Sequence, residues 1–227
     1  VGSVNRTLFA AIYAKGVYRS TQQGNGWMLT PLEEHFVNTL AVNSGGDIFA
    51  GHDGVSRSTD NGDSWTNFCR PRKDDGYTVA PIRSLAITAT GDILAGGDWL
   101  YRSNDNGITW TKFIIESASS VWFLCLFVSR GGDILAGVSP WGNYYGVYRS
   151  SDSGDSWALM NSGLPKASVL CIAVNANGYI FAATDRYGLY RSTNNGNDWT
   201  QAGLPNLRVS SVVINSAGHI FAGTDGS

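Results

Sequence analysis

Short apolar runs, separated by polar turns that contain glycine, recur along the whole chain. One run opens a unit, as in Leu40–Val42, and a second run, such as Ile48–Gly51, follows the turn at Ser44–Asp47. The runs are rich in β-branched and aromatic residues and are bounded by Gly, Asn, Asp and Ser, which is typical of β-strands. Because no stretch keeps its apolar residues at a 3.6-residue period, the sequence predicts no helix.

A third run, Val55–Ser58 in one unit, leads into an octapeptide that is repeated along the chain. The copies are Ser20–Trp27, Ser58–Trp65, Ser103–Trp110, Ser150–Trp157 and Ser192–Trp199. The unit that contains them has a period of about 40 residues, which lies in the range of propellers and solenoids. Four short antiparallel strands per unit, repeated radially, predict the blades of an all-β propeller.

The number of units predicts how many blades there are. We expect one propeller domain over residues 1–227, with repeat units at about 1–30, 36–68, 82–113, 121–160, 168–202 and 209–227. The second run occurs six times if Leu8–Ala11 is included, whereas the third run and the octapeptide occur five times. This favours six blades with an incomplete last blade. The alternatives are a five-bladed ring closed by the C-terminal strand and a fragment of a longer array. An incomplete blade has an unpaired strand edge, which predicts self-association through it.

The octapeptide resembles the Asp box of the BNR family, which is found in sialidases and other glycoside hydrolases, in sortilin-like receptors and in photosystem assembly factors. The resemblance covers nearly the whole chain and implies a β-propeller. Asp at the third position can accept hydrogen bonds from nearby backbone N–H groups, Gly at the fifth tolerates positive φ, and the Trp fills the gap to the neighbouring sheet. We therefore expect a structural role for Asp60, Gly62, Trp65, Asp105, Gly107, Trp110, Asp152, Gly154, Trp157, Asn194, Gly196 and Trp199, and a core position for Trp27 in the weakest copy.

Composition excludes several classes of function. The chain has 16 Lys and Arg against 18 Asp and Glu, for a formal net charge of −2, so it lacks the basic face of a nucleic-acid-binding protein. No apolar run reaches the about 18 residues of a membrane-spanning helix. Three cysteines without CxxC spacing predict neither a zinc site nor a disulfide framework, and we expect no metal or cofactor. Low charge with many Gly, Ser, Asn, Trp and Tyr residues favours an extracellular or periplasmic location.

The strand order separates two ends of each sheet. The first-to-second turns and the Asp boxes lie at one end and are nearly constant. The second-to-third loops and the connections between units lie at the other end and vary, and variable loops on a regular scaffold usually carry binding residues. The ligand-binding candidates on these loops are His52, Asp53, Asp98, Trp99, Trp141, Asn143, Tyr144, Tyr145, Asp185, Arg186 and Tyr187.

Two features of these loops suggest chemistry. Asp53, Asp98, Asp185 and Asp225 share one repeat position, which fits either turn formation or a ring of carboxylates for sugar hydroxyls or a cation. The insertion Trp141–Tyr145 has three aromatic residues and an Asn. It suits stacking on a sugar or anchoring of a protein partner, and packing over the neighbouring blade is the alternative.

An arginine also recurs once per unit on the third run: the members are Arg19, Arg57, Arg102, Arg149 and Arg191. Sialidases bind the carboxylate of their substrate with an arginine cluster, but such a cluster comes from non-equivalent positions. These repeat positions therefore favour packing and ion pairing between blades, with a stripe for an acidic partner as the alternative.

Resemblance to sialidases implies a catalytic set that this chain lacks. Its Glu residues are only Glu33, Glu34 and Glu116, and no counterpart of the Arg-Ile-Pro segment of that family is present. An inverting glycosidase needs two carboxylates about 6.5–9.5 Å apart, yet nothing marks two of the repeat Asp residues as special. We therefore predict a non-catalytic module that binds a glycan or an extracytoplasmic protein. The alternatives are a glycoside hydrolase and an assembly or sensing scaffold.

Overall fold

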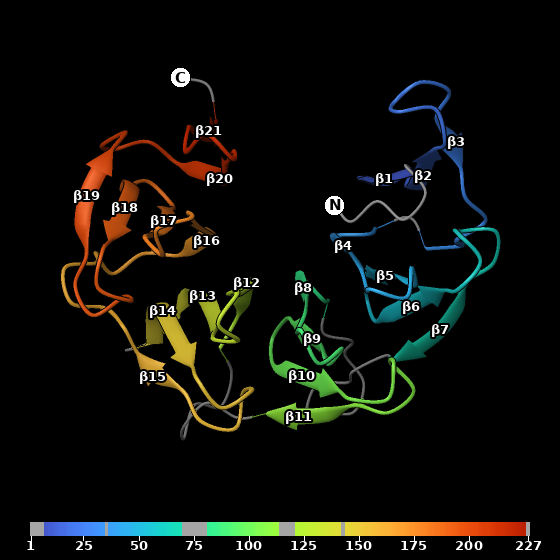
Figure 1. Cartoon of the computed structure of the whole chain (residues 1–227), viewed down its shortest axis with the longest axis horizontal. Coiled ribbons are helices and arrows are strands. Elements are labelled where there is room, and N and C mark those ends of the chain that lie inside the picture. The colour runs from blue at the N-terminus through green and yellow to red at the C-terminus, as the bar shows by residue number, and fades with distance from the viewer. Residues whose placement is uncertain (1–6, 35, 70–80, 114–120, 142–143, 226–227) are drawn as a thin grey trace. The chain divides into compact units, whose positions relative to one another are not determined.

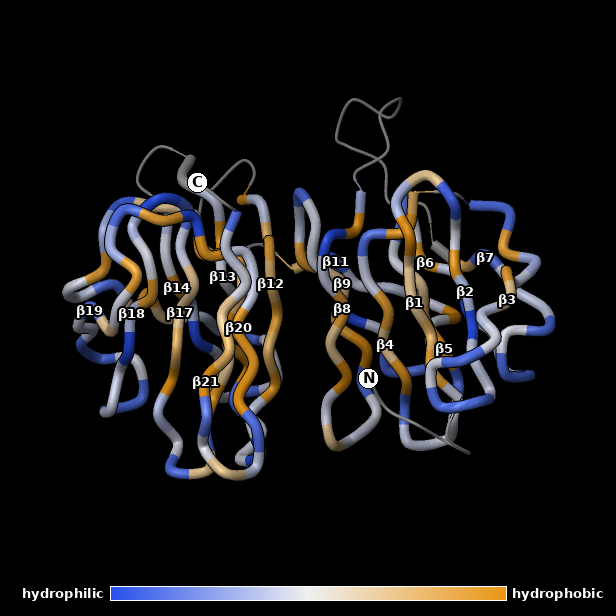
Figure 2. The backbone as a smooth tube through the Cα atoms, turned by 90° about the horizontal axis from the view of Figure 1, so that it is seen from above, coloured by the Kyte–Doolittle hydropathy of each residue, from blue (hydrophilic) through white to orange (hydrophobic). Residues whose placement is uncertain are grey.

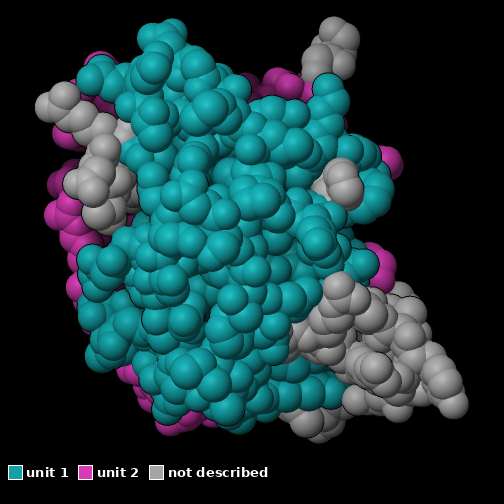
Figure 3. Space-filling model, turned by 90° about the vertical axis from the view of Figure 1, so that its right-hand side faces the viewer, with its two compact units in different colours: residues 1–112 teal, residues 113–227 magenta. Residues whose placement is uncertain are grey.

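The computed structural model describes residues 7–34, 36–69, 81–113, 121–141 and 144–225 (Figure 1). These ranges contain 21 strands and no helix. Consequently, no described helix is long and apolar enough to cross a membrane. The chain folds into two compact units, residues 1–112 and 113–227, which have different colours in Figure 3. Each unit consists of antiparallel sheets whose strands follow one another in chain order.

Unit 1 contains the first three sheets. The first sheet is β1 (Leu8–Ile12), β2 (Gly16–Ser20) and β3 (Met28–Leu29). The second sheet is β4 (Thr39–Val42), β5 (Ile48–Gly51), β6 (Val55–Ser58) and β7 (Thr66–Cys69). The third sheet is β8 (Ser84–Ile87), β9 (Ile93–Gly96), β10 (Leu100–Ser103) and β11 (Thr111–Phe113). In the first sheet, β1 to β3 correspond to the second, third and fourth strands of the other sheets.

Unit 2 contains the other three sheets. The fourth sheet is β12 (Phe123–Val128), β13 (Ile134–Trp141), β14 (Tyr144–Ser150) and β15 (Ala158–Leu159). The fifth sheet is β16 (Val169–Val174), β17 (Ile180–Thr184), β18 (Gly188–Ser192) and β19 (Thr200–Gly203). Within the described residues, the sixth sheet consists of β20 (Val209–Ile214) and β21 (Ile220–Thr224). The predicted antiparallel blades are therefore confirmed, as six sheets of two to four strands in the described residues.

In the four-stranded sheets the second strand is the most buried part. Ile48, Phe49 and Ala50 of β5 are at most 1% exposed, and Figure 2 shows hydrophobic residues along strands such as β4, β12 and β20. Neighbouring sheets of one unit pack through their first strands, β4 against β8 and β16 against both β12 and β20. A Cβ on Gly137, at the end of the second-strand motif in β13, would lie 2.4 Å from Cys125 Sγ and 2.7 Å from the Val169 carbonyl oxygen. Only glycine therefore allows this approach of the sheets.

The Asp boxes form a fixed pattern of hydrogen bonds. In the second sheet, Asp60 Oδ1 accepts from Ser58 Oγ at 2.7 Å and from the Ser64 N–H at 2.8 Å. Hydrogen bonds from the Ser64 side chain and backbone, and then from Ser58, lower the pKa of Asp60 from 3.8 to about 2. The equivalent bonds also lower the pKa values of Asp105 and Asp152 to about 2. These carboxylates are turn-forming groups, because their acceptor sites are filled by their own boxes.

Each box contains two consecutive residues in the left-handed region. Asn61 has φ 60° and Gly62 has φ 86°, and the other boxes have similar pairs, from 55° to 62° at the first residue and from 86° to 99° at the glycine. The sequence predicted positive φ only for the glycine. Asn and Ser at the preceding position tolerate this conformation better than larger or branched residues do, which explains the polar residue found there.

The serine that opens each box is more buried than its aspartate. Ser58 Oγ donates to Asp60 and accepts from the Gly62 N–H at 2.8 Å. Its counterparts Ser103, Ser150 and Ser192 make the same bond to the box glycine. The opening serines are all at most 1% exposed. Sequence analysis missed this role, because a small polar residue in a turn is expected to be exposed.

Three of the box tryptophans pack against the sheet that precedes their own within the same unit. Trp65, Trp110 and Trp199 belong to hydrophobic clusters that contain residues of the first, second and fourth sheets, respectively. The core position expected for Trp27 is wrong, because this side chain is 42% exposed. The reason is that the first sheet of unit 1 has no preceding sheet in that unit to receive its ring.

Candidate functional site

The loops between second and third strands, together with the connections between sheets, form one end of each unit, here called the loop face. In unit 1 the predicted residues His52, Asp98 and Trp99 are buried, with exposures of 1%, 5% and 7%. His52 Nε2 hydrogen-bonds Ser56 Oγ at 2.9 Å. Trp99 belongs to the hydrophobic core of the second and third sheets, and the Lys112 ammonium lies 3.4 Å from its ring centroid. A ligand cannot stack on this ring, so that expectation is wrong.

The four aspartates of the shared loop position have different environments. Asp53 is exposed and Asp98 is buried. In unit 2, Asp185 and Asp225 are bridged by Arg208, with distances of 3.3 Å from Nε to Asp185 Oδ1 and 2.6 Å from Nη1 to Asp225 Oδ2. The hydrogen bond and charge of Asp225, together with the charge of Asp185, raise the pKa of Arg208. The aspartates thus do not form a set of equivalent carboxylates.

Arg208 was not predicted from the sequence, because it lies in a connection between blades and has no counterpart in the other repeats. Its neighbour in space is the loop that carries Arg186 and Tyr187. Arg186 has φ 68° and is exposed, and Tyr187 is 47% exposed. The loop is held by bonds from the Asp185 N–H to the Ser168 carbonyl at 3.0 Å and from Gln201 Nε2 to the Tyr187 carbonyl at 3.1 Å. A fixed loop therefore presents an aromatic ring and a cation to solvent.

The insertion at Trp141–Tyr145 lengthens one hairpin. β13 has 8 residues and β14 has 7, and the register pairs Trp141 with Tyr144. Asn143 and the side chains of Trp141 and Tyr144 lie outside the described structure. Tyr145 is half-buried, and its carbonyl accepts a 2.6 Å bond from Asn161 Nδ2. Binding by this insertion remains a prediction.

Unit 1 has an exposed aromatic pair on its loop face that sequence analysis missed. Tyr13 follows β1 and is 79% exposed, and Phe36 lies in the connection to β4 and is 55% exposed. Their ring centroids are 5.4 Å apart in an edge-to-face arrangement. Ile12, beside Tyr13 in the chain, is 41% exposed. The signal that could have found Tyr13 is its place in a second-to-third loop.

The other end of each unit, here called the turn face, carries the first-to-second turns and the Asp boxes. Its repeated arginines have partners. Arg19 Nη1 donates to the Asn61 carbonyl at 2.7 Å and Arg57 Nη1 to the Asn106 carbonyl at 2.6 Å, in each case reaching the Asp box of the next sheet. The side chains of Arg102 and Arg149 pair with carboxylates of their own sheets, Asp92 and Asp133. These contacts favour the structural interpretation of the arginines.

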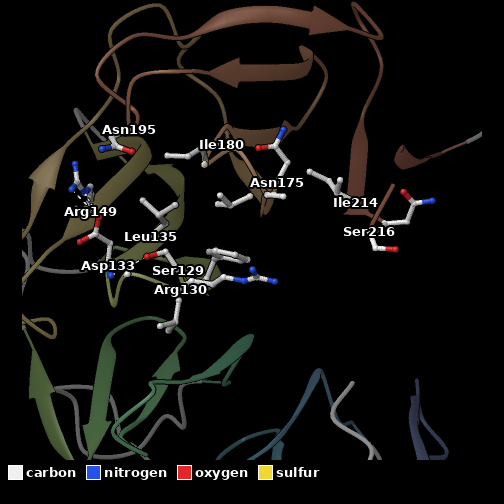
Figure 4. A pocket seen from close by; sticks show the side chains of 17 residues that line it. Ser129, Arg130, Asp133, Leu135, Arg149, Asn175, Ile180, Asn195, Ile214 and Ser216 are labelled. Atoms are coloured by element: carbon white, nitrogen blue, oxygen red, sulfur yellow. Dashed lines mark hydrogen bonds and ion pairs between the residues drawn. The ribbon is translucent and has the colours of Figure 1, made fainter. Parts of the chain in front are cut away.

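A cavity of about 590 Å³ opens on the turn face of unit 2 (Figure 4). Its lining comes from the fourth, fifth and sixth sheets and includes Arg149, Asp133, Asn195, Asn175 and Ser216. Figure 4 shows Leu135 and Ile180 between the group around Arg149 and the group around Asn175. Sequence analysis missed this cavity, because the turn face is nearly constant in sequence.

Among the described residues, no group of three or more His, Cys, Asp or Glu side chains could hold a metal ion. Cys125 and Cys171 are free thiols, and burial raises both of their pKa values. Such thiols are poor nucleophiles, because the thiolate is the reactive form.

No protein-family model and no curated protein matches the chain. Among solved structures, it is similar to an ancestral GH74 enzyme, with TM-score 0.77, 21% identity and coverage of 96% of this chain and 33% of the other. It is also similar to PorZ, an essential bacterial surface component of the type-IX secretion system of Porphyromonas gingivalis, with TM-score 0.73, 14% identity and coverage of 99% and 38%. YCF48 bound to D1 peptide gives TM-score 0.64, 16% identity and coverage of 92% and 68%.

These likenesses confirm the β-propeller fold that the Asp boxes predicted. The chain spans about a third of the length of the GH74 enzyme and somewhat more of PorZ. The proteins that share the fold include an enzyme, a surface component and a peptide-bound protein, so the fold by itself does not select a function.

Proposed function

We propose that the chain is a non-catalytic, extracytoplasmic binding module that takes a protein partner on the loop face. The observation that carries the proposal is the exposed edge-to-face pair of Tyr13 and Phe36. Aromatic residues are enriched in protein interfaces, where a large ring buries much area at little cost in side-chain entropy. The exposed Tyr187, on its fixed loop in unit 2, supplies an aromatic residue of the same kind.

Two of the structural relatives support a protein partner and an extracytoplasmic location. YCF48 is seen bound to a peptide, and PorZ is a bacterial surface component. The low net charge of −2 is compatible with either location that we expect, extracellular or periplasmic.

The aspartates of the loop face favour binding over hydrolysis. An inverting glycosidase needs one protonated carboxyl group as acid and a second, ionised one as base. Asp185 and Asp225 instead share one guanidinium, that of Arg208, and Asp98 is buried. This arrangement offers no pair of carboxyl groups with separate acid and base roles.

The test is affinity capture from an extracytoplasmic extract of the source organism, together with a glycan array, using the whole chain. The double variant Tyr13→Ser/Phe36→Ser removes the aromatic pair. Ile108→Ser is the matched control, because Ile108 is 60% exposed but lies in an Asp box on the turn face. We expect one protein to be captured by wild type and Ile108→Ser and lost from the double variant. Equal capture by all three chains would contradict the proposal, and array binding without protein capture would replace the protein by a glycan.

A further inference from the structure

The cavity on the turn face of unit 2 lies at a place where, in unit 1, two neighbouring sheets hydrogen-bond directly to one another. In unit 1, side chains of Asn43, Asp47 and Arg57 in the second sheet hydrogen-bond Asn106 in the Asp box of the third sheet. This set of contacts is here called the clasp. Asn106 Nδ2 donates to Asp47 Oδ2 at 2.6 Å, Asn106 Oδ1 accepts from Asn43 Nδ2 at 3.1 Å, and the Asn106 carbonyl accepts from Arg57 at 2.6 Å. In the clasp, the polar groups of the two sheets therefore hydrogen-bond directly to one another.

In unit 2 the same repeat positions also carry polar residues, but the described residues show no such hydrogen bonds between the fourth and fifth sheets. Ser129, Asp133 and Arg149 of the fourth sheet take the places of Asn43, Asp47 and Arg57, and Asn195 of the fifth takes the place of Asn106. These four residues all line the cavity. Arg149 uses Nε and Nη2 on Asp133, at 3.0 and 2.8 Å. Within the described ranges, neither Arg149 Nη1 nor the side-chain amide of Asn195 has a hydrogen-bonding partner.

The rest of the lining gives the cavity a second polar group and an apolar floor. Asn175, which lines the cavity, uses its Oδ1 to accept the N–H groups of Asn177 at 3.0 Å and Tyr179 at 2.9 Å within its own turn, so Nδ2 is the atom of its amide that can donate to a ligand. Leu135 and Ile180 are at most 4% exposed and lie between the two polar groups in Figure 4. Small-molecule sites commonly have this composition, an apolar wall with a few polar groups, in a volume of about 300–1,000 Å³.

The chemistry of the polar groups selects the ligand. Arg149 and Asp133 form an ion pair, so together they offer donors and acceptors without net charge. The Asn195 amide offers both a donor and an acceptor, and Asn175 offers its Nδ2 as a donor. Arg130, an exposed residue of the same lining, adds one positive charge. A hydroxyl group can donate to the carboxylate while it accepts from the guanidinium, and the C–H face of a sugar ring can cover the apolar wall. We propose that this cavity binds a small neutral saccharide, whose hydroxyl groups bridge Arg149 and Asp133 to Asn195. This site is separate from the proposed protein-binding loop face.

The test uses the whole chain and a matched pair of variants. Asn195→Gly removes the amide, and glycine adopts φ 59° without steric strain. Asn106→Gly makes the same change at φ 59° in the clasp of unit 1. Saturation-transfer NMR with glucose, galactose, mannose, xylose, cellobiose and lactose, each at about 10 mM, detects affinities in the millimolar range, and titration gives the Kd of any sugar that binds.

We expect at least one sugar to bind wild type and Asn106→Gly with the same Kd, and Asn195→Gly to weaken it by about tenfold or more, the effect of one hydrogen bond to a ligand. Asn106→Gly, by contrast, should lower stability, because it breaks the clasp. Binding of none of the six sugars would overturn the proposal. So would equal binding by Asn195→Gly, or binding of acetate in a parallel titration without binding of any sugar. These results do not depend on whether the loop face captures a protein.

Discussion

Replacing Ser150 by Ala tests how an Asp box is held together. Ser150 is 1% exposed. Its Oγ donates to Asp152 Oδ1 at 2.7 Å and accepts from the Gly154 N–H at 2.8 Å. Alanine keeps the Cβ and suits the same backbone conformation, but it removes these two hydrogen bonds and a longer one of 3.4 Å from the Asp152 N–H. The Gly154 N–H is then left without its acceptor in a buried position.

The magnitude follows from the two bonds. A buried donor without a partner costs about 1–3 kcal/mol, and a neutral hydrogen bond contributes about 1 kcal/mol net. Because Asp152 is exposed to water, most of the effect comes from the glycine N–H, and we expect the free energy of unfolding to fall by about 2 kcal/mol. Ser151→Ala is the control: Ser151 is exposed, and such surface changes usually stay within about 0.5 kcal/mol.

Urea unfolding followed by tryptophan fluorescence measures both variants, and NMR titration of the Asp152 carboxyl group gives a second readout. A bond from Ser150 is one of the causes that lower the pKa of Asp152 to about 2, so this pKa should rise in Ser150→Ala. If Ser150→Ala unfolds at the same urea concentration as Ser151→Ala, the serine is not the buried centre of the box and the reasoning fails.

Three further changes probe the rest of the scaffold. The pKa values of about 2 for Asp60, Asp105 and Asp152 lie below the usual 3.8. The stabilisation of the folded state by these carboxylates is therefore complete above about pH 4 and is lost as the pH falls toward 2. Urea midpoints measured from pH 5 to pH 2 should show this loss of stability, and Asp105→Asn should make the loss smaller. Trp199→Phe removes the 2.8 Å bond from Nε1 to the Met160 carbonyl and should lower the free energy of unfolding by about 1–3 kcal/mol. Gly137→Ala, with a methyl group 2.4 Å from Cys125 Sγ, should lower the melting temperature through an overpacking cost of about 1–3 kcal/mol, whereas Gly131→Ala, whose nearest neighbour is at 3.8 Å, should not.

The fold could be predicted from the sequence because its signals are local and repeated. Alternating runs and turns mark the strands, and the octapeptide marks the turn between the third and fourth strands of five sheets. What could not be read locally is burial. Trp99 and Asp98 look like loop residues in the sequence, yet both are buried, since the loop after β9 folds against its neighbours.

The candidate sites depend on distances between segments, which a single sequence does not contain. Arg208 bridges Asp185 and Asp225, 23 and 17 residues away in the chain, and no repeat position marks it. Asn106 and Asn195 occupy the same repeat position, yet one is clasped and the other lines a cavity. Sequence repetition therefore predicts the scaffold well, but it does not predict which repeat positions make different contacts in different blades.

The bonds from Arg19 and Arg57 to the next Asp box have a consequence for how such a chain can grow. Donor and acceptor both lie at repeat positions, the arginine on the third strand and the carbonyl in the box that follows. A duplicated unit that forms these bonds has a donor for its successor and an acceptor for its predecessor already in place, whereas Arg149, at the same position, binds Asp133 of its own sheet. Gene duplication can lengthen this kind of chain by whole blades without first evolving a new interface, and each added copy is then free to diverge in its loops.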